Sequence, residues 1–507
     1  MHAIELGDHI AVSDVVEAAR GGASVAIGAG ARDRVVAARQ MVEELVRTRR
    51  PVYGITTGFG KFSDVIISPD QTELLQRNLL MSHACGVGEP LDGEVVRAMM
   101  LLRAQALARG HSGIRPETLD LLVSMLNRGV HPVVPEQGSL GASGDLAPLA
   151  HMCLPLIGLG EAVFQGERLP GAEALRRAGL TPVELSSKEG LALINGTQAM
   201  TGIGALALAD ALMLLKVADI AAALTAEALG AIPAAWDARI QALRIHPGQV
   251  AAAANLRMLV QGSKLVTEPG AIRTQDPYTL RCIPQVHGAS RTAIAHVADV
   301  VGWEINAVTD NPLLFPEDGD VISGGNFHGQ PVALAMDYLG IALAELADIA
   351  ERRIERLVNP ALSGLPAFLT RRGGLHSGLM IPQYTAASLV SENKILAHPA
   401  SVDSIPSSAN QEDHVSMGTT GARKARKILA NVSRVLAIEL MCAAQALEFS
   451  DPAGLGAGTR PAYQTIRELV PPLDEDRVLA PDIEALAVLV RSGKLVAAVE
   501  AAIGSLA

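Results

Sequence analysis

Hydrophobic positions recur at helical spacing through most of the chain after residue 197. Between residues 330 and 358, Met336, Leu339, Leu343 and Leu346 follow one another at intervals of three or four, which places them on one face of a helix. Asn359-Pro360 should end this helix. The same pattern predicts further long helices at 198–231, 288–308, 383–397 and 418–448.

The last two turns of the helix predicted at 330–358 carry a run of charges. Glu351 and Glu355 alternate with Arg352 and Arg356. We expect this end to face solvent, because charged side chains at i and i+4 usually mark an exposed helix surface.

Shorter helical patterns, interrupted by glycine, precede residue 197. They predict helices within 12–50 and at 70–82, 92–109, 116–128 and 145–157, with a small hairpin around AVFQGERL at 162–169. Gly-, Pro- and Asn-rich loops follow at 265–288, 309–331 and 398–417. We expect the chemistry to lie in such loops, on a rigid helical frame.

These patterns predict a mainly α protein built on a long central helical bundle. We expect an N-terminal domain over 1–197, mixed but mostly helical, and a long-helix bundle with a C-terminal helical region over 198–507. Hydrophobic residues make up 49% of the 507 residues and aromatic residues only 3%, so the core must be aliphatic. Aliphatic side chains suit closely packed helices better than sheets.

Charge and cysteine usage narrow the range of functions. The net charge is −11 and the sequence has no run of five basic residues, which argues against nucleic acid or an anionic membrane as a partner. The four cysteines show no Cys-x-x-Cys pair and the histidines no His-Glu-x-x-His, so we expect neither a disulfide framework nor a metal site. The chain begins without a basic, apolar leader, and we expect a cytoplasmic protein.

The loop GSLGASGDLAPLA at 138–150 interrupts this helical pattern with three glycines and two serines in seven residues. If the chain bends sharply there, the amide nitrogen of Gly144 can attack the carbonyl carbon of Ala142, since glycine has no side chain to block the approach. Loss of water closes a five-membered ring, and loss of the Ser143 hydroxyl as water leaves an exocyclic methylene. The product is a methylidene-imidazolone electrophile. The alternative is an ordinary Gly/Ser loop.

The wider string GSLGASGDLAPLAHM resembles the signature of the aromatic amino acid ammonia-lyases and aminomutases. Motifs from about residue 50 to 420 extend the resemblance in order and spacing, and they match the histidine-specific members of the family. The resemblance implies a fumarase/aspartase-like helical fold. It also implies elimination of ammonia from L-histidine to give trans-urocanate, with a 4-methylidene-imidazol-5-one formed autocatalytically from Ala142-Ser143-Gly144.

Other cofactors are not expected. In YGITTGFGKFSD (53–64) a P-loop would need glycine at Ile55 and a hydroxyl at Phe62, so nucleotide binding is rejected, and NAD and PLP are not implied. The family resemblance instead makes Tyr53 the base that removes the substrate β-proton. A tyrosine has a pKa near 10 and needs help from its surroundings to act as a base.

The resemblance assigns the substrate ring to two loops. In NLLMSHACGVGEP (78–90), Ser82 and His83 would contact the ring, and in SANQEDHVSMG (408–418) Glu412 would face it. A carboxylate can accept a hydrogen bond from an imidazole N–H but is poorly placed beside a phenyl ring. A structural histidine and an exposed acidic helix start are the alternatives.

Further positions follow from the remaining motifs. The resemblance implies that Arg281, in RTQDPYTLRCIPQVHG (273–288), binds the substrate carboxylate, and the chemistry agrees, since guanidinium pairs with carboxylate in a bidentate way. A surface turn at Asp276-Pro277 with a solvated arginine is the alternative. The resemblance makes Asn195 and Tyr278 catalytic. It adds Gln275 in the same loop as a substrate-binding residue, Asn311 in TDNPLLF (309–315) and Phe327 in SGGNFHGQP (323–331). Met380, in HSGLMIPQYTAA (376–387), is expected nearby, with a core residue as the alternative.

The resemblance implies a homotetramer whose active sites combine loops of three subunits, with no nucleic acid or membrane partner.

Two alternative functions remain open beside this one. A tyrosine or phenylalanine ammonia-lyase or aminomutase is the nearest rival, and a non-enzymatic helical scaffold is another. The mobile Gly-Ser-Ser-x-Met-Pro-x-Lys-x-Asn loop of the fumarase/aspartase enzymes is absent from the sequence. The sequence does not decide whether the electrophile takes up the substrate amine or attacks the imidazole ring.

Overall fold

The computed structural model describes residues 3–62, 65–68 and 71–507. The chain is mainly helical, as the sequence predicts, and it divides into two compact units. Unit 1 comprises Met1–Ala209, Ala298–Asp337 and Pro399–Arg423, and unit 2 comprises Asp210–Val297, Tyr338–His398 and Lys424–Ala507.

These units differ from the predicted division at residue 197. Four long helices carry the chain from one unit to the other: α9 (Gln198–Ala228), α13 (Ile283–Glu304), α14 (Gln330–Val358) and α17 (Gly418–Leu447). Each helix is continuous across the boundary, so the chain enters each unit several times and a single cut does not separate them. The polar loops at the ends of these helices fall in unit 1 or unit 2 according to the direction of the helix.

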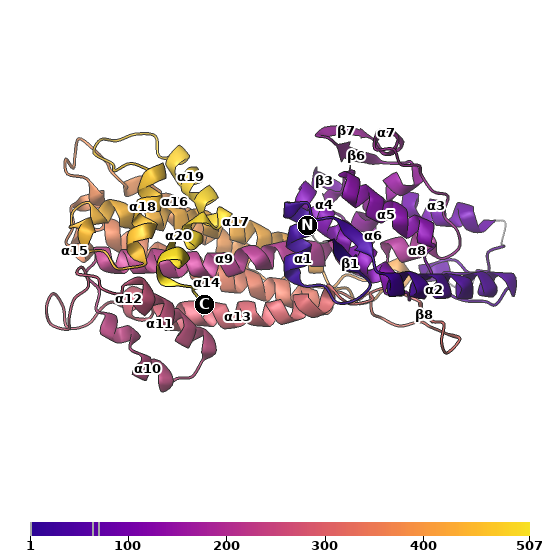
Figure 1. Cartoon of the computed structure of the whole chain (residues 1–507), viewed down its shortest axis with the longest axis horizontal. Helices are drawn as coiled ribbons and strands as arrows, with labels where there is room; N and C mark the ends of the chain where they lie inside the picture. The colour runs from indigo at the N-terminus through magenta and orange to yellow at the C-terminus, as the bar shows by residue number, and fades with distance from the viewer. Residues whose placement is uncertain (1–2, 63–64, 69–70) are drawn as a thin grey trace. The chain divides into compact units, whose positions relative to one another are not determined.

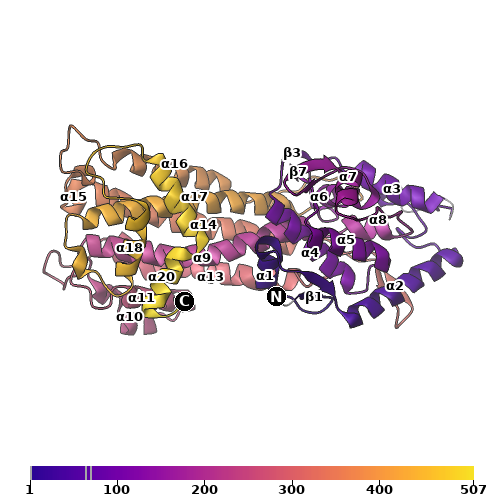
Figure 2. The ribbon, with the colours of Figure 1, turned by 45° about the horizontal axis from the view of Figure 1, so that its top comes forward.

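In unit 2 the long helices form the expected bundle, and their segments lie side by side (Figure 1, Figure 2). The Ser290 hydroxyl of α13 donates to the Ala342 carbonyl of α14 at 2.8 Å. Gly340 of α14 approaches α17 so closely that a Cβ there would lie 3.1 Å from Cδ1 of Ile428. The apolar stripe predicted on α14 is buried, and Leu339, Leu343 and Leu346 are all 0% exposed.

The C-terminal end of α14 is less exposed than predicted. Glu351 is only 2% exposed, because it accepts a hydrogen bond from Gln383 of α16 (Met380–Leu396) and pairs with Arg352. Arg353 is fully buried, and of this charged run only Arg352 is exposed. A helix packed on several sides buries part of its charged end, which the spacing of charges alone does not reveal.

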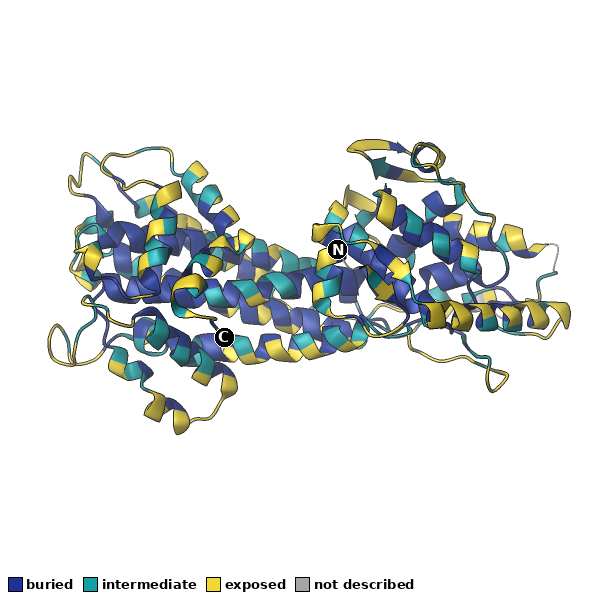
Figure 3. Cartoon of the chain, in the orientation of Figure 1, coloured by how far each residue is buried: buried dark blue, intermediate teal, exposed yellow. Residues whose placement is uncertain are grey.

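Unit 1 is built around α4 (Gly93–Ala108), whose residues are almost all buried. The burial pattern in Figure 3 shows the same concentration of buried residues inside each unit. Around α4 pack α2 (Ala29–Arg47) and α5 (Pro116–Arg128). The proline at the first position of α5 and Gly129 in the left-handed conformation after it fix its two ends. Three further helices carry site residues: α3 (Thr72–His83), α6 (Leu146–Cys153) and α8 (Glu189–Ile194). The predicted start of α3 at residue 70 lies outside the described residues.

Small sheets complete unit 1. The hairpin predicted at AVFQGERL is present as β6 (Glu161–Phe164) and β7 (Glu167–Pro170), with Phe164 paired to Glu167. The other described pairs are β1–β2 (Ile4–Leu6, Val25–Ile27), parallel, and three antiparallel pairs: β3–β5 (Val87–Pro90, Pro135–Gln137), β4–β6 (β4 His131–Pro132) and β8–β9 (Leu313–Phe315, Asp320–Ile322).

The predicted loop 265–288 is shorter in the structure, because α12 (Tyr278–Arg281) lies within it and α13 already begins at Ile283. The remaining helices are α1 (Val12–Val16), α7 (Gly171–Arg177), α10 (Ala238–Ala242), α11 (Pro247–Leu259), α15 (Pro360–Ser363), α18 (Thr459–Leu469), α19 (Ala480–Ser492) and α20 (Lys494–Ile503). By length and composition α17 could cross a membrane, but 83% of its most apolar stretch is buried within the protein, which is typical of a core helix.

Candidate active site

The glycine loop of unit 1 runs between β5 and α6 and is held in one tight conformation. Gly144 has φ +78°, and a Cβ at this position would lie 2.1 Å from the carbonyl oxygen of Gly196. The next residue, Asp145, donates its amide to that same oxygen at 2.7 Å. Only glycine fits so close to another backbone, so residue 144 is a glycine for steric as well as conformational reasons.

A second contact fixes the start of the reactive triplet. Gly141 has φ +82°, and a Cβ there would meet the Ser416 hydroxyl at 2.2 Å. The amides of Ser416 and Met417 donate to the carbonyls of Gly141 and Leu140 at 3.3 and 3.2 Å. The loop therefore lies between the 196 turn and the segment that precedes α17.

The buried carboxylate of Asp145 anchors the loop to two helices. It accepts hydrogen bonds from the Ser139 hydroxyl at 2.7 Å, from the Met200 amide at 2.8 Å and from the Thr419 hydroxyl. Met200 lies in the first turn of α9 and Thr419 in the first turn of α17. Both helix N-termini favour a negative charge at this point.

A cavity of about 790 Å³ opens beside Ser143. One wall is apolar and comes mainly from α3, α6, α8 and the loop after Tyr53, while polar side chains face the same space. Besides Ser143, five of these polar residues were selected by the sequence analysis: Tyr53, Ser82, His83, Asn195 and Glu412. Two others, Asn78 and Ser408, were not. An apolar pocket with a few convergent polar groups is the usual form of a small-molecule site.

Glu412 lies in a loop and not at the exposed helix start that was the alternative reading. Its backbone pairs with Ser407 through two hydrogen bonds, of 2.9 and 3.3 Å, and its side chain is half-buried. One carboxylate oxygen accepts from the Ser143 hydroxyl at 3.2 Å and the other from the Ser407 hydroxyl at 3.1 Å. The carboxylate is thereby held at the reactive serine.

His83 is the last residue of α3, and its ring is oriented by the helix backbone. The Nδ1 atom lies 2.9 Å from the Leu79 carbonyl and 3.0 Å from the Ser82 hydroxyl. Since the carbonyl can only accept, Nδ1 carries the proton and Nε2 is left as an acceptor. Burial lowers the pKa of His83 below its usual value, against the opposing effect of this carbonyl and of Glu412. Ser82 itself is exposed.

Tyr53 lies across the cavity with its hydroxyl accepting from the Gly60 amide at 3.3 Å. Burial raises the pKa of Tyr53 above 10, and the carboxylates of Glu412 and Asp310 raise it further, while the Gly60 amide lowers it. The described residues of unit 1 therefore hold this phenol in its protonated form.

Asn195 connects the glycine loop to the 311 loop. The side-chain Nδ2 atom of Asn195 lies 3.4 Å from the backbone carbonyl oxygen of Asn311, and the backbone carbonyl of Asn195 accepts a hydrogen bond from Arg103 at 3.0 Å. The Oδ1 atom of Asn195 is buried and has no hydrogen-bond partner among the described residues. A buried acceptor of this kind is available to a ligand.

A smaller cavity of about 350 Å³ shares Tyr53, Ser143, Asn195 and Glu412 with the first. Ala142, Asn311 and Phe327 line it as well, so the structure brings these three predicted residues to the same point. The Asn311 side chain is held by the Gly324 amide at 2.8 Å.

Four predicted site residues belong to unit 2, and all described residues that line the two cavities belong to unit 1. In unit 2, Arg281 donates to the Gln275 side chain at 3.0 Å and its guanidinium carbon lies 4.6 Å from the centre of the Tyr278 ring. These three side chains form one cluster. Met380 is the half-buried first residue of α16.

Sequence reasoning missed several residues that hold the site, among them Ser407 and the buried Asp145 and Arg103. Arg103 is fully buried on α4 and donates to the carbonyls of Ala192 and Asn195. It is the only charged residue between Met99 and Ala108, and a lone charge inside an apolar helix was a usable signal. Ser407 supports Glu412, but one serine in a serine-rich loop carries no comparable signal.

Comparisons with known proteins agree over the whole chain. The family model described as aromatic amino acid lyase matches residues 10–468. A protein named histidine ammonia-lyase from Symbiobacterium thermophilum is 76% identical over 506 residues, covering 100% of both chains. The crystal structure of histidine ammonia-lyase from Trypanosoma cruzi matches with a TM-score of 0.92 at 43% identity, covering 99% of this chain and 96% of that one. Tyrosine aminomutase from Streptomyces globisporus matches with a TM-score of 0.96 at 38% identity, covering 100% of both chains. The chain belongs to the aromatic amino acid lyase family.

Proposed function

We propose that this protein is a histidine ammonia-lyase, which eliminates ammonia from L-histidine and releases trans-urocanate. The observation that supports it most is the placement of His83 and Glu412 in one cavity with Ser143. The fold does not distinguish substrates, since a tyrosine aminomutase matches it as well as a histidine ammonia-lyase does. The polar side chains of His83 and Glu412 are the features of this cavity that suit an imidazole ring.

The residues of the glycine loop fit a methylidene-imidazolone made from Ala142-Ser143-Gly144. Gly144 and Gly141 lie where a Cβ would collide with the Gly196 carbonyl and the Ser416 hydroxyl, so glycine at these positions allows the close packing of the loop. The buried, unpartnered Oδ1 of Asn195 is an acceptor beside the triplet. When formed, this group supplies an electrophilic carbon that turns the substrate amine into a better leaving group.

His83 and Glu412 would bind the imidazole ring of the substrate. Neutral His83 offers Nε2 as an acceptor, because Nδ1 donates to the Leu79 carbonyl. Glu412 offers a second acceptor, held by Ser407. A ring with an N–H can donate to either group, whereas a phenyl ring can donate to neither.

Tyr53 would take the substrate β-proton on its phenolic oxygen. Its raised pKa means that it needs a positive charge close by before it can act as a base at neutral pH. The described residues that line the two cavities include no lysine or arginine. The substrate ammonium and Arg281 are the cations that the proposal brings to this phenol.

A shared active site is the second part of the proposal. We propose a homotetramer in which the cluster of Gln275, Tyr278 and half-buried Arg281 on one chain completes the cavity of another, with three chains contributing to each site. Arg281 would then bind the substrate carboxylate, and its guanidinium remains charged at any working pH. Long helices with a high aliphatic content are suited to pair across subunits.

An ultraviolet assay tests the substrate. Purified protein receives L-histidine, L-tyrosine or L-phenylalanine, and the conjugated acid is followed by its absorbance. We expect a signal from histidine alone. A signal from tyrosine or phenylalanine instead would keep the electrophile and reject the proposed roles of His83 and Glu412. With no signal from any of the three, an intact mass lacking the loss of two waters would reject the electrophile too.

The Glu412→Gln variant tests the same proposal at one residue. We expect kcat/KM for histidine to fall by at least about tenfold, because a buried hydrogen bond to a charged group is worth roughly 1.5–3 kcal/mol. Glu73→Gln is the matched control, since Glu73 is exposed on α3. Equal activity of the two variants would contradict a substrate contact at Glu412.

A further inference from the structure

The segment that carries Gln275, Tyr278 and Arg281 is attached to unit 2 by residues with no part in the proposed chemistry. Asp276 is 3% exposed and Leu280 is 0% exposed, whereas Gln275 is exposed and Tyr278 is 70% exposed. One set of residues is therefore buried as an anchor, and the other set is presented outward.

The first anchor is the carboxylate of Asp276. It accepts a hydrogen bond from the Ile232 amide at 2.6 Å and, with its other oxygen, from the Arg273 side chain at 2.6 Å. Arg273 in turn donates to the carbonyls of Leu229 and Gly230 at 2.8 and 3.2 Å. The chain that follows α9 thus binds the start of the segment.

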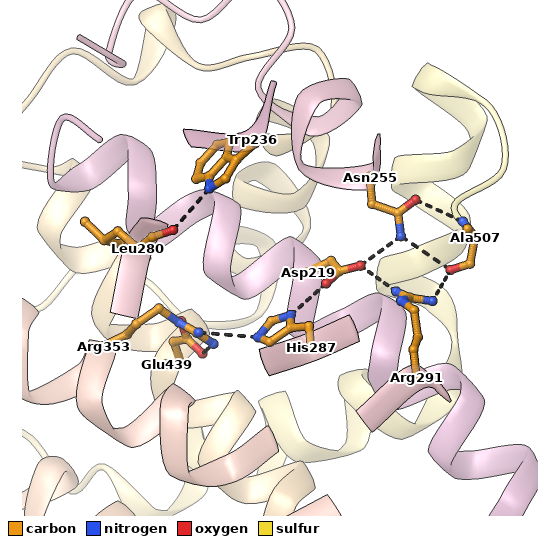
Figure 4. Close-up of polar contacts among 9 residues, drawn as sticks. All are labelled: Asp219, Trp236, Asn255, Leu280, His287, Arg291, Arg353, Glu439 and Ala507. Atoms are coloured by element: carbon orange, nitrogen blue, oxygen red, sulfur yellow. Dashed lines mark hydrogen bonds and ion pairs between the residues drawn. The ribbon is translucent and has the colours of Figure 1, made fainter. Parts of the chain in front are cut away.

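The second anchor is Trp236, the last residue of a short 3₁₀ helix (Pro233–Trp236). It is fully buried, and its indole N–H donates to the Leu280 carbonyl at 3.1 Å (Figure 4). In a continuous helix this carbonyl would accept from the amide of residue 284. Residue 284 is a proline, which has no N–H, so the helical donor is missing and the indole supplies one.

The third anchor lies in the first turns of α13. His287 donates from Nδ1 to Asp219 at 2.7 Å, and Arg353 lies 3.4 Å from its Nε2 (Figure 4). Asp219 also accepts from Asn255 at 2.8 Å and from Arg291. This buried network joins α13 to α9, α11 and α14. Only the Leu280 anchor lies between Tyr278 and Arg281 themselves.

We propose that Trp236 is a positioning residue for the substrate carboxylate. Its indole N–H replaces the amide that Pro284 lacks, holds the single turn Tyr278–Arg281, and thereby sets the direction of the Arg281 guanidinium. The buried Nε of Arg281 has no hydrogen-bond partner among the described residues, so its side chain is ordered mainly by Gln275, Tyr278 and this turn. The inference rests on the proposed function, because it takes Arg281 as the carboxylate ligand.

The Trp236→Phe variant removes the donor and keeps an aromatic ring. We expect KM for L-histidine to rise about fivefold or more with kcat changed less than about twofold, because a misdirected carboxylate contact weakens uniform binding. Inhibition by urocanate, which carries a carboxylate, should weaken by the same factor, and inhibition by imidazole, which carries none, should not change. A merely structural role would not separate these two inhibitors.

A double-mutant cycle with Arg281→Lys tests whether Trp236 acts through Arg281. We expect the double variant to be close to Arg281→Lys alone, since the direction of a side chain no longer matters once its guanidinium is lost. Additive effects of the two changes on KM would overturn the inference. Trp303→Phe is the matched control, because this second tryptophan of the chain is 71% exposed and should leave both inhibition constants unchanged.

Circular dichroism and the inhibition measurements separate a folding defect from a functional defect. If Trp236→Phe does not give a folded protein by circular dichroism, Asp276→Asn replaces it, since asparagine keeps an acceptor for the Ile232 amide and loses the charge that holds Arg273. The same separation of urocanate from imidazole is expected. If wild type forms no urocanate from histidine, the proposed function fails and this inference falls with it. If wild type is active and both variants weaken the two inhibitors equally, only this inference fails.

Discussion

The glycines of the reactive loop show how single residues shape this site. Gly144 is favoured by the close approach of the Gly196 backbone and Gly141 by that of the Ser416 hydroxyl, and both have positive φ values. Other glycines of the chain, such as Gly166 in the β6–β7 turn, share the positive φ but have open space around them. The two kinds of glycine can therefore be separated by experiment.

Gly144→Ala should abolish ring closure and activity. The added Cβ would meet the Gly196 carbonyl oxygen at 2.1 Å, and the left-handed conformation costs an alanine about 1–2 kcal/mol in addition. Intact mass should show the unmodified chain, without the loss of two waters. Gly166→Ala carries the same conformational cost but no collision with described atoms, and it should keep normal mass and activity. Retained activity in Gly144→Ala would contradict the proposed electrophile.

The long helices of unit 2 are joined by buried ion pairs in addition to apolar packing. Arg353 of α14 and Glu439 of α17 are both 0% exposed and form a bidentate pair, with donor–acceptor distances of 2.5 and 3.0 Å. Thr225 of α9 donates to the same carboxylate at 3.0 Å. Three helices thus meet at one buried charge, which favours one register of the bundle over others.

Arg353→Met should strongly destabilise the bundle. Removing one partner leaves Glu439 buried and unpaired, which costs about 3–5 kcal/mol. Arg372→Met is the control in the same unit, where the side chain and its partner Glu475 are 55% and 73% exposed and the loss should be about 0–1 kcal/mol. Thermal and urea unfolding midpoints of the two variants measure the difference. Similar midpoints would contradict the role assigned to the buried pair.

The contact between α4 and β4 predicts how stability responds to acid. Burial, and to a lesser extent the charge of Arg97, lower the pKa of His131 from 6.5 to about 4. Its Nε2 lies 3.1 Å from the Arg97 guanidinium. As pH falls below 6.5 the unfolded chain takes up a proton that the folded chain refuses, so stability is lost between pH 6.5 and about 4.

The melting temperature of His131→Gln should therefore fall less than that of wild type between pH 7.5 and pH 5. Glutamine can still accept from Arg97 but does not titrate. His9→Gln, at an exposed histidine, should follow wild type over the same range. The melting temperatures of the three proteins at both pH values decide the matter, and an unchanged slope for His131→Gln would reject the assignment.

At the scale of the whole molecule, the proposal combines more than one chain in each active site. Unit 1 provides both cavities and the Ala142-Ser143-Gly144 triplet, and unit 2 provides the cluster of Gln275, Tyr278 and Arg281. If these come together between copies, two defective chains can complement each other.

Ser143→Ala and Arg281→Ala chains should each be inactive alone and regain activity when they are co-expressed. With random assembly of equal amounts, about a quarter of the sites would combine an intact triplet from one chain with an intact arginine from another. The mixed assembly is purified by two different affinity tags and assayed with histidine. No recovery of activity would place both groups of a site on one chain.

Much of the fold follows from periodicity. The apolar stripe on α14, the proline-initiated α5 and the Gln165-Gly166 hairpin are local features, and local features can be read from neighbouring residues. The burial of Glu351 and Arg353 could not be predicted in this way, because it depends on helices that are distant in sequence. The start of α13 at Ile283 was not predicted, for a related reason. Ile283-Pro284 by itself is typical of a loop, and the contact made by Trp236 and the network around His287 involve residues that are distant in sequence.

The sequence by itself determined the helical class, the family and the residues of the reactive loop, because these depend on spacing and on residue type along short stretches. Only the tertiary structure decided that Glu412 contacts Ser143, that Nδ1 of His83 is the protonated nitrogen, and that Arg281 belongs to unit 2 while the described residues lining both cavities belong to unit 1. Those facts depend on distances between loops separated by as many as 269 residues, and a linear pattern does not contain such distances.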